Sequence, residues 1–189
     1  MIVLGIESTA HTFGVGIIKD KEVLANVKDS YTTEEGGMIP FKAQEHHVKV
    51  CDEVIKNALE TAGINMKDVD LISFSQGPGM GHTLRVGAMT ARTLSIVNDI
   101  PLIGVNHCIA HLTIGEELTG AKDTVLLYVS GANTQVIAYE GGKYRIFGET
   151  LDMGIGNFLD SFARNMGLGF PGGPKVAALA EKSKNYIEL

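Results

Sequence analysis

Hydrophobic and polar residues follow two distinct periods along this chain of 189 residues. Short apolar runs, bounded by polar turns, indicate strands, whereas apolar positions three and four residues apart indicate helices. The pattern predicts strands at 2–6, 12–18, 23–27, 71–75 and 102–105, and helices at about 41–62, 83–96 and 107–117. The first three strands are close enough together to form a meander, and the later strands alternate with helices. This order is typical of a mixed α/β protein.

The opening pattern then returns in the second part of the chain. At an offset of 122 residues, four residues are matched by identical ones: Ser8, Ala10, Thr12 and Lys21 by Ser130, Ala132, Thr134 and Lys143. Strands are predicted at 125–129, 135–139 and 144–147, and helices at 157–166 and 175–184. A repeated meander followed by helices is the plan of the two-lobed actin-like ATPase fold, which belongs to the ribonuclease H-like group. We therefore expect one lobe at 1–122 and an incomplete second lobe at 123–189, with a single one-sheet α/β domain as the alternative.

Composition narrows the class of protein only a little. The net charge of −6 does not suggest general nucleic-acid binding, so any RNA contact must be local or supplied by a partner. Cys51 and Cys108 are not closely spaced and are interpreted as reduced core residues. There is no apolar run of membrane-spanning length and no basic leader at the start, so we expect a cytoplasmic protein without a membrane partner.

Two histidines provide the clearest candidate for a metal site. His107 and His111 are four residues apart in a predicted helix, which places both imidazoles on one face. The alternative is a pair of surface or capping histidines, and no other cluster supplies a convincing third ligand. Cys108 stands where a zinc peptidase has its general base, which argues against peptidase activity. His46 and His47 are interpreted as structural residues.

Several small polar loops are candidates for binding phosphate. The loops at 7–12 and 128–134 follow the first strand of each repeat, and their backbone N–H groups can cradle an anion, although simple hairpins use the same residues. Glycine-rich segments at 154–157 and 170–174 lead into the last two predicted helices, the first of which carries Asp160. Asp160 can also be explained as a residue favoured near a helix N-terminus.

Taken together, these segments resemble one enzyme family along the whole chain. The resemblance rests on seven motifs, at 5–12, 75–86, 104–111, 128–131, 133–135, 148–152 and 167–174. They are similar to the archaeal and eukaryotic branch of the tRNA N6-adenosine threonylcarbamoyltransferases, the catalytic subunit of the KEOPS complex, formerly described as an O-sialoglycoprotein endopeptidase.

The resemblance implies a reaction and a set of site residues. The family transfers a threonylcarbamoyl group from threonylcarbamoyl-AMP to N6 of the adenosine 3′ of the anticodon, in tRNAs that read ANN codons. It implies one metal ion, iron or zinc, bound by His107 and His111 with Tyr128 beside it. It also implies a site for threonylcarbamoyl-AMP or ATP made by Tyr128, Val129, Ser130, Gly131, Ala132, Asp160 and Gly173. No catalytic acid or base is assigned.

The resemblance also implies partners, and this sequence departs from the family's pattern in three places. The expected partners are tRNA and the other KEOPS subunits, including a small kinase or ATPase. Ala132 replaces a usual glycine, and Ala177 replaces a frequent glutamate of the nucleotide pocket. The family's aspartate metal ligand and its later asparagine-containing loop have no counterpart here, so the chain alone is expected to have an incomplete site.

Two other functions stay open at this point. A non-catalytic scaffold of the same complex would not need His107 and His111. A sugar or acetate kinase shares the fold, but would need an Asp-Gly phosphate loop where this chain has Glu7 and Ser8.

Overall fold

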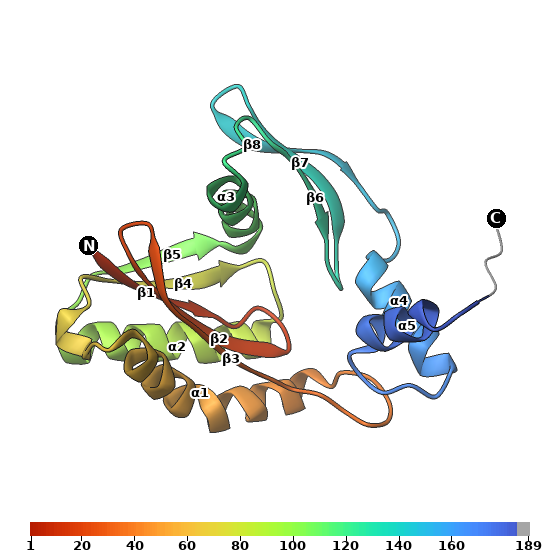
Figure 1. The fold of residues 1–189 in the computed structure, drawn as a ribbon, viewed down its shortest axis with the longest axis horizontal. Helices are drawn as coiled ribbons and strands as arrows, with labels where there is room; N and C mark the ends of the chain where they lie inside the picture. Colours follow the sequence, from red (N-terminus) through yellow and green to blue (C-terminus); the bar gives the residue numbers. More distant parts are fainter. Residues whose placement is uncertain (185–189) are drawn as a thin grey trace. The chain divides into compact units, whose positions relative to one another are not determined.

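A computed structural model describes residues 1–184 (Figure 1). The strands are β1 (Ile2–Glu7), β2 (Thr12–Lys19), β3 (Glu22–Ser30), β4 (Leu71–Gly77), β5 (Leu102–Asn106), β6 (Val125–Val129), β7 (Thr134–Glu140) and β8 (Lys143–Glu149). The helices are α1 (Pro40–Ala62), a 3-10 turn η1 (Met66–Asp68), α2 (Gly81–Asn98), α3 (His107–Thr119), α4 (Ile155–Asn165) and α5 (Gly172–Glu181). Every strand and helix predicted from the pattern is present. The largest differences are three residues: β3 ends at Ser30 instead of residue 27, and α5 spans Gly172–Glu181 instead of 175–184.

The first compact unit comprises Met1–Tyr31 and Ile39–Ala110. Its five-stranded sheet has the order β3-β2-β1-β4-β5, in which β1 is antiparallel to β2 and parallel to β4. Helices α1 and α2 pack on each other and on the same face of this sheet (Figure 1). The core between helices and sheet is apolar because alternate strand residues point into it. Its fully buried members include Leu4, Phe13, Ile17, Ala58 and Ile72.

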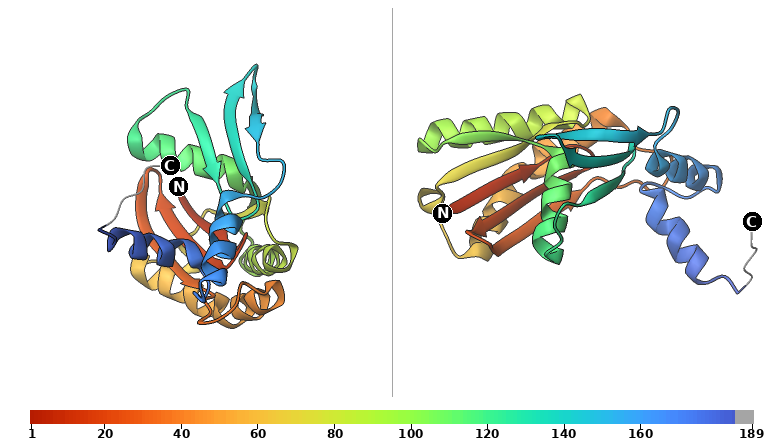
Figure 2. Two further views of the ribbon diagram at one scale, coloured as in Figure 1. Left: turned by 90° about the vertical axis from the view of Figure 1, so that its right-hand side faces the viewer. Right: turned by 90° about the horizontal axis from the view of Figure 1, so that it is seen from above.

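The second compact unit comprises Thr32–Met38 and the chain from His111 onward. Strands β6, β7 and β8 form a separate antiparallel sheet, seen from two further sides in Figure 2. Helices α4 and α5 pack against each other. The segment 32–38 belongs to this unit because Thr33 pairs with Phe170 as an isolated β-bridge. Two separate sheets contradict the alternative of a single α/β domain with one sheet.

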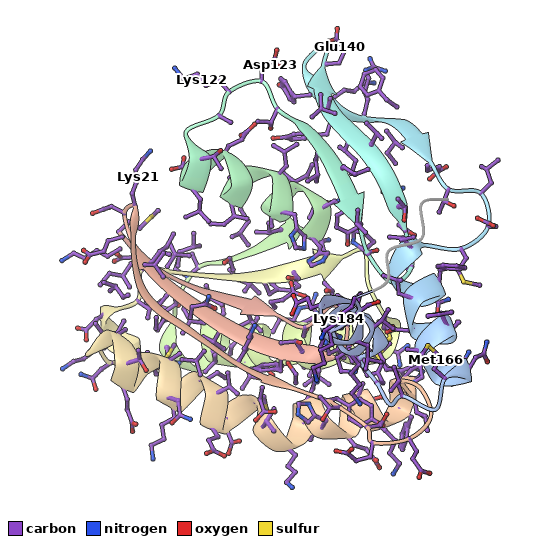
Figure 3. The ribbon with its side chains drawn as sticks, turned by 45° about the vertical axis from the view of Figure 1, so that its right-hand side comes forward. Lys21, Lys122, Asp123, Glu140, Met166 and Lys184 are labelled. Carbon is purple, nitrogen blue, oxygen red and sulfur yellow. The ribbon has the colours of Figure 1, made fainter. Side chains whose placement is uncertain are left out.

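The two meanders share one pattern of strand pairing, but at a different offset from the one predicted. Leu4 pairs with Ile17 in the first meander, and Val125 pairs with Ala138 in the second, which is an offset of 121 residues on both strands. The identities at an offset of 122, such as Ser8 with Ser130, therefore do not mark equivalent positions. Lys21 and Glu140 lie at the tips of the two corresponding hairpins (Figure 3).

Candidate functional site

Glu7, the last residue of β1, is the centre of a polar cluster in the first unit. Its carboxylate accepts hydrogen bonds from the backbone N–H of Thr9 at 2.7 Å and from the hydroxyls of Thr9 and Ser75. It also lies 3.1 Å from Nδ1 of His107, the first residue of α3. The parallel pairing of β4 between β1 and β5 brings these residues to one edge of the sheet, at the carboxyl ends of its strands.

This cluster determines the charge of Glu7, which faces one ring nitrogen of His107. Burial raises the pKa of Glu7, but hydrogen bonds from His107, Ser75 and Thr9 together outweigh it and lower the pKa to about 2. At neutral pH Glu7 is therefore an ionised carboxylate, which only accepts hydrogen bonds, so Nδ1 of His107 carries the proton. Nε2 of the same ring lies 3.5 Å from the Thr9 hydroxyl.

A corresponding contact exists in the second unit. The imidazole of His111 lies with its ring centre 5.6 Å from that of Tyr128, which is buried at 8% exposure in β6. The offset of 121 residues makes Tyr128 the equivalent of Glu7, because Tyr128 pairs with Gln135 as Glu7 pairs with Gly14. In each meander the residue at this position of the strand pairing therefore contacts one of the two histidines of α3. Glu7 contacts His107, and Tyr128 contacts His111. The helical spacing predicted for His107 and His111 is confirmed.

The loop after β6 is held in a tight turn. The backbone N–H and the hydroxyl of Ser130 both donate to the carbonyl of Asn133 at 2.9 Å. The carbonyl of Ser130 accepts the N–H of Gly156 at 3.0 Å, which fixes the start of α4 against the loop. A Cβ on Gly156 would lie 2.8 Å from that carbonyl oxygen, so the close approach requires glycine.

The remaining predicted nucleotide-binding residues lie around this loop and α5. Gly131 and Ala132 are exposed at the tip of the turn, and the side chain of Val129 is 54% exposed, so Val129 can contribute only its backbone to a polar site. Asp160 on α4 accepts the N–H of Gly172 at 2.8 Å and thereby fixes the start of α5. Gly173 lies in the first turn of α5, where backbone N–H groups have no partner within the helix.

The donors for a metal ion in the described part of the chain are few. Residues 1–184 contain no group of three or more His, Cys, Asp or Glu side chains arranged to hold a metal. Two imidazoles on one helix, one of them backed by a carboxylate, nevertheless match the chemistry of a zinc or iron site. Sequence reasoning missed Glu7 as part of this site. The available signal was a carboxylate at the end of the first strand.

Among residues 1–184 no helix combines the length and apolar character needed to cross a membrane. His47 is fully buried in α1, in edge-to-face contact with Phe13, so its interpretation as a structural residue fits its position.

Solved structures place the chain in a known class of fold. It is similar to component A of (R)-2-hydroxyglutaryl-CoA dehydratase from Acidaminococcus fermentans, with a TM-score of 0.59 and 18% identity over 99% of this chain and 61% of that chain. It is also similar to YeaZ from Pseudomonas aeruginosa, with a TM-score of 0.55 and 16% identity over 79% of this chain and 65% of that chain. The protein has the actin-like α/β fold, with an incomplete second lobe.

Sequence comparison gives the family within this class. Residues 22–189 match the family described as tRNA N6-adenosine threonylcarbamoyltransferase, and the chain belongs to it. The enzyme of that name from Thermococcus kodakarensis is 61% identical over all of this chain and 58% of its own length. A probable bifunctional tRNA threonylcarbamoyladenosine biosynthesis protein from Thermoplasma volcanium is 51% identical, over all of this chain and 36% of its own length. The chain thus spans little more than half of the first relative and about a third of the second.

Proposed function

We propose that this protein takes part in the biosynthesis of threonylcarbamoyladenosine in tRNA, as the acyltransferase that uses threonylcarbamoyl-AMP, in the cytoplasm. Family membership supports the reaction class, and the contact between Glu7 and His107 supports the position of the site. In the proposed reaction the N6 amine attacks the carbamoyl carbonyl carbon. The bond from that carbon to the phosphate oxygen breaks, AMP leaves with the electron pair, and the amine loses a proton.

Glu7 is proposed as a positioning residue for His107. A carboxylate with a pKa of about 2 is a weak general base near neutral pH, so Glu7 is poorly suited to take the proton from the amine. Its contact with Nδ1 instead fixes the orientation of the His107 ring. This arrangement prepares His107 to bind an electrophile.

That electrophile is proposed to be an iron or zinc ion held by His107 and His111, with Tyr128 beside it. When bound, the ion supplies Lewis-acid polarisation of the carbonyl. Tyr128 keeps His111 packed through its ring contact, and the burial of Tyr128 limits the access of water on that side.

The loop after β6 is proposed to hold the adenylate. The turn fixed by Ser130 and Gly156 exposes backbone at Gly131 and Ala132 that can approach a phosphate closely. The first turn of α5, anchored by Asp160, offers further N–H donors near Gly173. KEOPS subunits, including a small kinase or ATPase, are proposed to deliver tRNA to this acidic chain.

The direct test is incorporation of labelled threonine into tRNA. The chain would be supplied with threonylcarbamoyl-AMP and KEOPS partners, in parallel with a version joined to the remaining sequence of the Thermococcus kodakarensis relative. We expect activity from the joined protein and its loss in His107→Ala, with Lys21→Ala, at an exposed hairpin tip, as the matched control. No activity from the joined protein would contradict the transferase proposal and favour a non-catalytic module.

A further inference from the structure

The segment that connects β3 with α1 packs on the helices that follow the second sheet. This strap, defined here as residues 32–38, belongs to the second unit although both flanking elements belong to the first (Figure 1). Its start is fixed, because the backbone N–H of Tyr31 donates to the carbonyl of His11 at 2.8 Å. Two residues later, Thr33 forms a β-bridge with Phe170. The strap is therefore an ordered part of the second unit.

Three hydrogen bonds join Thr33 to Phe170. The N–H of Thr33 donates to the carbonyl of Phe170 at 3.0 Å. The N–H of Phe170 donates to the carbonyl of Thr33 at 3.1 Å and lies 3.2 Å from its hydroxyl oxygen. Phe170 is buried and stands two residues before Gly172, the first residue of α5. The bridge thus holds the chain directly before the helical turn that is proposed to present N–H donors to the adenylate.

Gly169 shows how closely the strap approaches this loop. A Cβ at position 169 would lie 2.1 Å from the carbonyl oxygen of Thr33 and 2.4 Å from that of Glu34. Both atoms belong to the backbone, so no side-chain rotation could relieve the clash. The φ angle of Gly169 is not positive, so glycine is required here for the close approach of the strap and not for a left-handed turn.

The strap also lines a small polar cavity against α4. The cavity has a volume of about 120 Å³, and its walls include Gly37 of the strap with Asp160 and Arg164 of α4. A Cβ on Gly37 would lie 3.2 Å from Nη1 of Arg164, so the guanidinium group is close to the strap backbone. Asp160 is the carboxylate that accepts the N–H of Gly172. The strap therefore adjoins both residues that fix the start of α5, Phe170 and Asp160.

We propose that the strap is a positioning element of the adenylate site, in which Thr33 acts through Phe170 on the first turn of α5. The proposal rests on the adenylate site proposed above and adds to it a residue 137 positions away in the chain. Helix α5 begins with Gly172 and Gly173, whose backbone is conformationally free, and Pro171 provides no side-chain cap. Contacts outside the helix must therefore preorganise its N–H donors for an anion.

Two pairs of variants separate this role from general destabilisation. Gly169→Ala places a methyl group against the strap backbone, and Gly115→Ala, at an exposed position on α3 where the added Cβ meets no neighbouring atom within 4 Å, is its control. Thr33→Pro removes the N–H that donates to Phe170, whereas Thr33→Ser keeps both that N–H and the hydroxyl. Hydrogen exchange is measured on the chain itself, and ATP binding is measured by calorimetry on the joined protein.

The expected result is a local loss of order together with weaker binding. In Gly169→Ala and Thr33→Pro, exchange of the amides at 170–177 should speed up by about tenfold or more, while the β6 and β7 amides keep their protection. ATP affinity should fall by about tenfold in the same two variants. Gly115→Ala and Thr33→Ser should change neither quantity.

Two results would overturn the proposal directly. One is unchanged exchange at 170–177, or unchanged ATP affinity, in both Gly169→Ala and Thr33→Pro. The other is an equal loss of protection in β6 and β7, which would indicate general destabilisation. An unsubstituted joined protein that binds no ATP would overturn the adenylate site and this proposal with it, even where the exchange data confirm that the strap holds the start of α5.

Discussion

The two meanders have the same strand order and pairing pattern but a different burial of the equivalent face. In the first unit the face with Leu4 and Ile6 forms the centre of a core, whereas the equivalent face with Val125 and Leu127 is open. The pairing of the strands therefore does not determine whether a sheet face becomes a core or an exposed surface. Burial depends on the elements that pack over the sheet, and α1 and α2 provide them only for the first unit.

The largest expected effect comes from truncating equivalent side chains on this face. Ile6→Ala should lower the free energy of unfolding by about 3 kcal/mol, because it removes buried methylene groups and leaves a cavity. Leu127→Ala should change it by less than about 0.5 kcal/mol, because the side chain is already 64% exposed. Urea unfolding of both variants measures the difference. Similar losses would contradict the contrast between the two units.

Acid should destabilise the first unit through His47. Burial, with a smaller contribution from neighbouring His46, lowers the pKa of His47 from 6.5 to about 4. Between these values the unfolded chain binds a proton that the folded chain does not. The contribution of His47 to the free energy of unfolding is therefore fully present above about pH 6.5 and is lost as the pH drops towards 4. The loss should approach about 3 kcal/mol from this residue. Unfolding measured from pH 7 to pH 4 tests this.

Substitution of His47 separates its contribution from that of other groups. His47→Leu should flatten the decline in stability between pH 6.5 and 4, whereas His82→Leu, at an exposed position on α2, should leave it unchanged. Hydrogen exchange should show that acid weakens protection of β1 and β2 more than that of β6 and β7. An unaltered pH profile in His47→Leu would refute this assignment.

In both units the close backbone contact of a glycine with a loop should be equally sensitive to an added Cβ. A Cβ on Gly79 would lie 2.7 Å from the carbonyl oxygen of Thr9, and one on Gly156 would lie 2.8 Å from that of Ser130, the equivalent residue. Gly79→Ala and Gly156→Ala should each cost about 2 kcal/mol by forcing backbone apart. Gly131→Ala, which meets no atom within 4 Å, serves as the control. Thermal unfolding compares them, and a neutral Gly156→Ala would show that the loop can move.

The smallest expected effect distinguishes Glu7 from its equivalent, Tyr128. Glu7→Gln removes the charge behind His107 and should weaken zinc binding by about tenfold. Tyr128→Phe keeps the ring against His111 and should weaken it by about threefold or less. Calorimetric titration with zinc measures both, with Glu22→Gln, at an exposed position on β3, as the control. Equal effects of Glu7→Gln and Glu22→Gln would count against a positioning role for Glu7.

Local pattern was sufficient to predict the elements but not their register. The strand at 125–129 coincides with β6, and the helix at 107–117 lies within α3, because periodicity depends on local residues alone. The predicted offset of 122 rested on identities such as Ser8 with Ser130, whereas hydrogen-bond pairing gives 121. A shift of one residue exchanges the two faces of a strand, so it concealed the equivalence of Glu7 and Tyr128.

The sequence by itself determined the two meanders, the actin-like fold and the pair of histidines one turn apart on α3. These features follow from the spacing of residues along short segments. Only the tertiary structure brought Glu7 against His107, one hundred positions away, and fixed which side of β6 is exposed. Such contacts depend on the register of strand pairing and on the elements that cover each sheet, and both arise from residues distant in the chain.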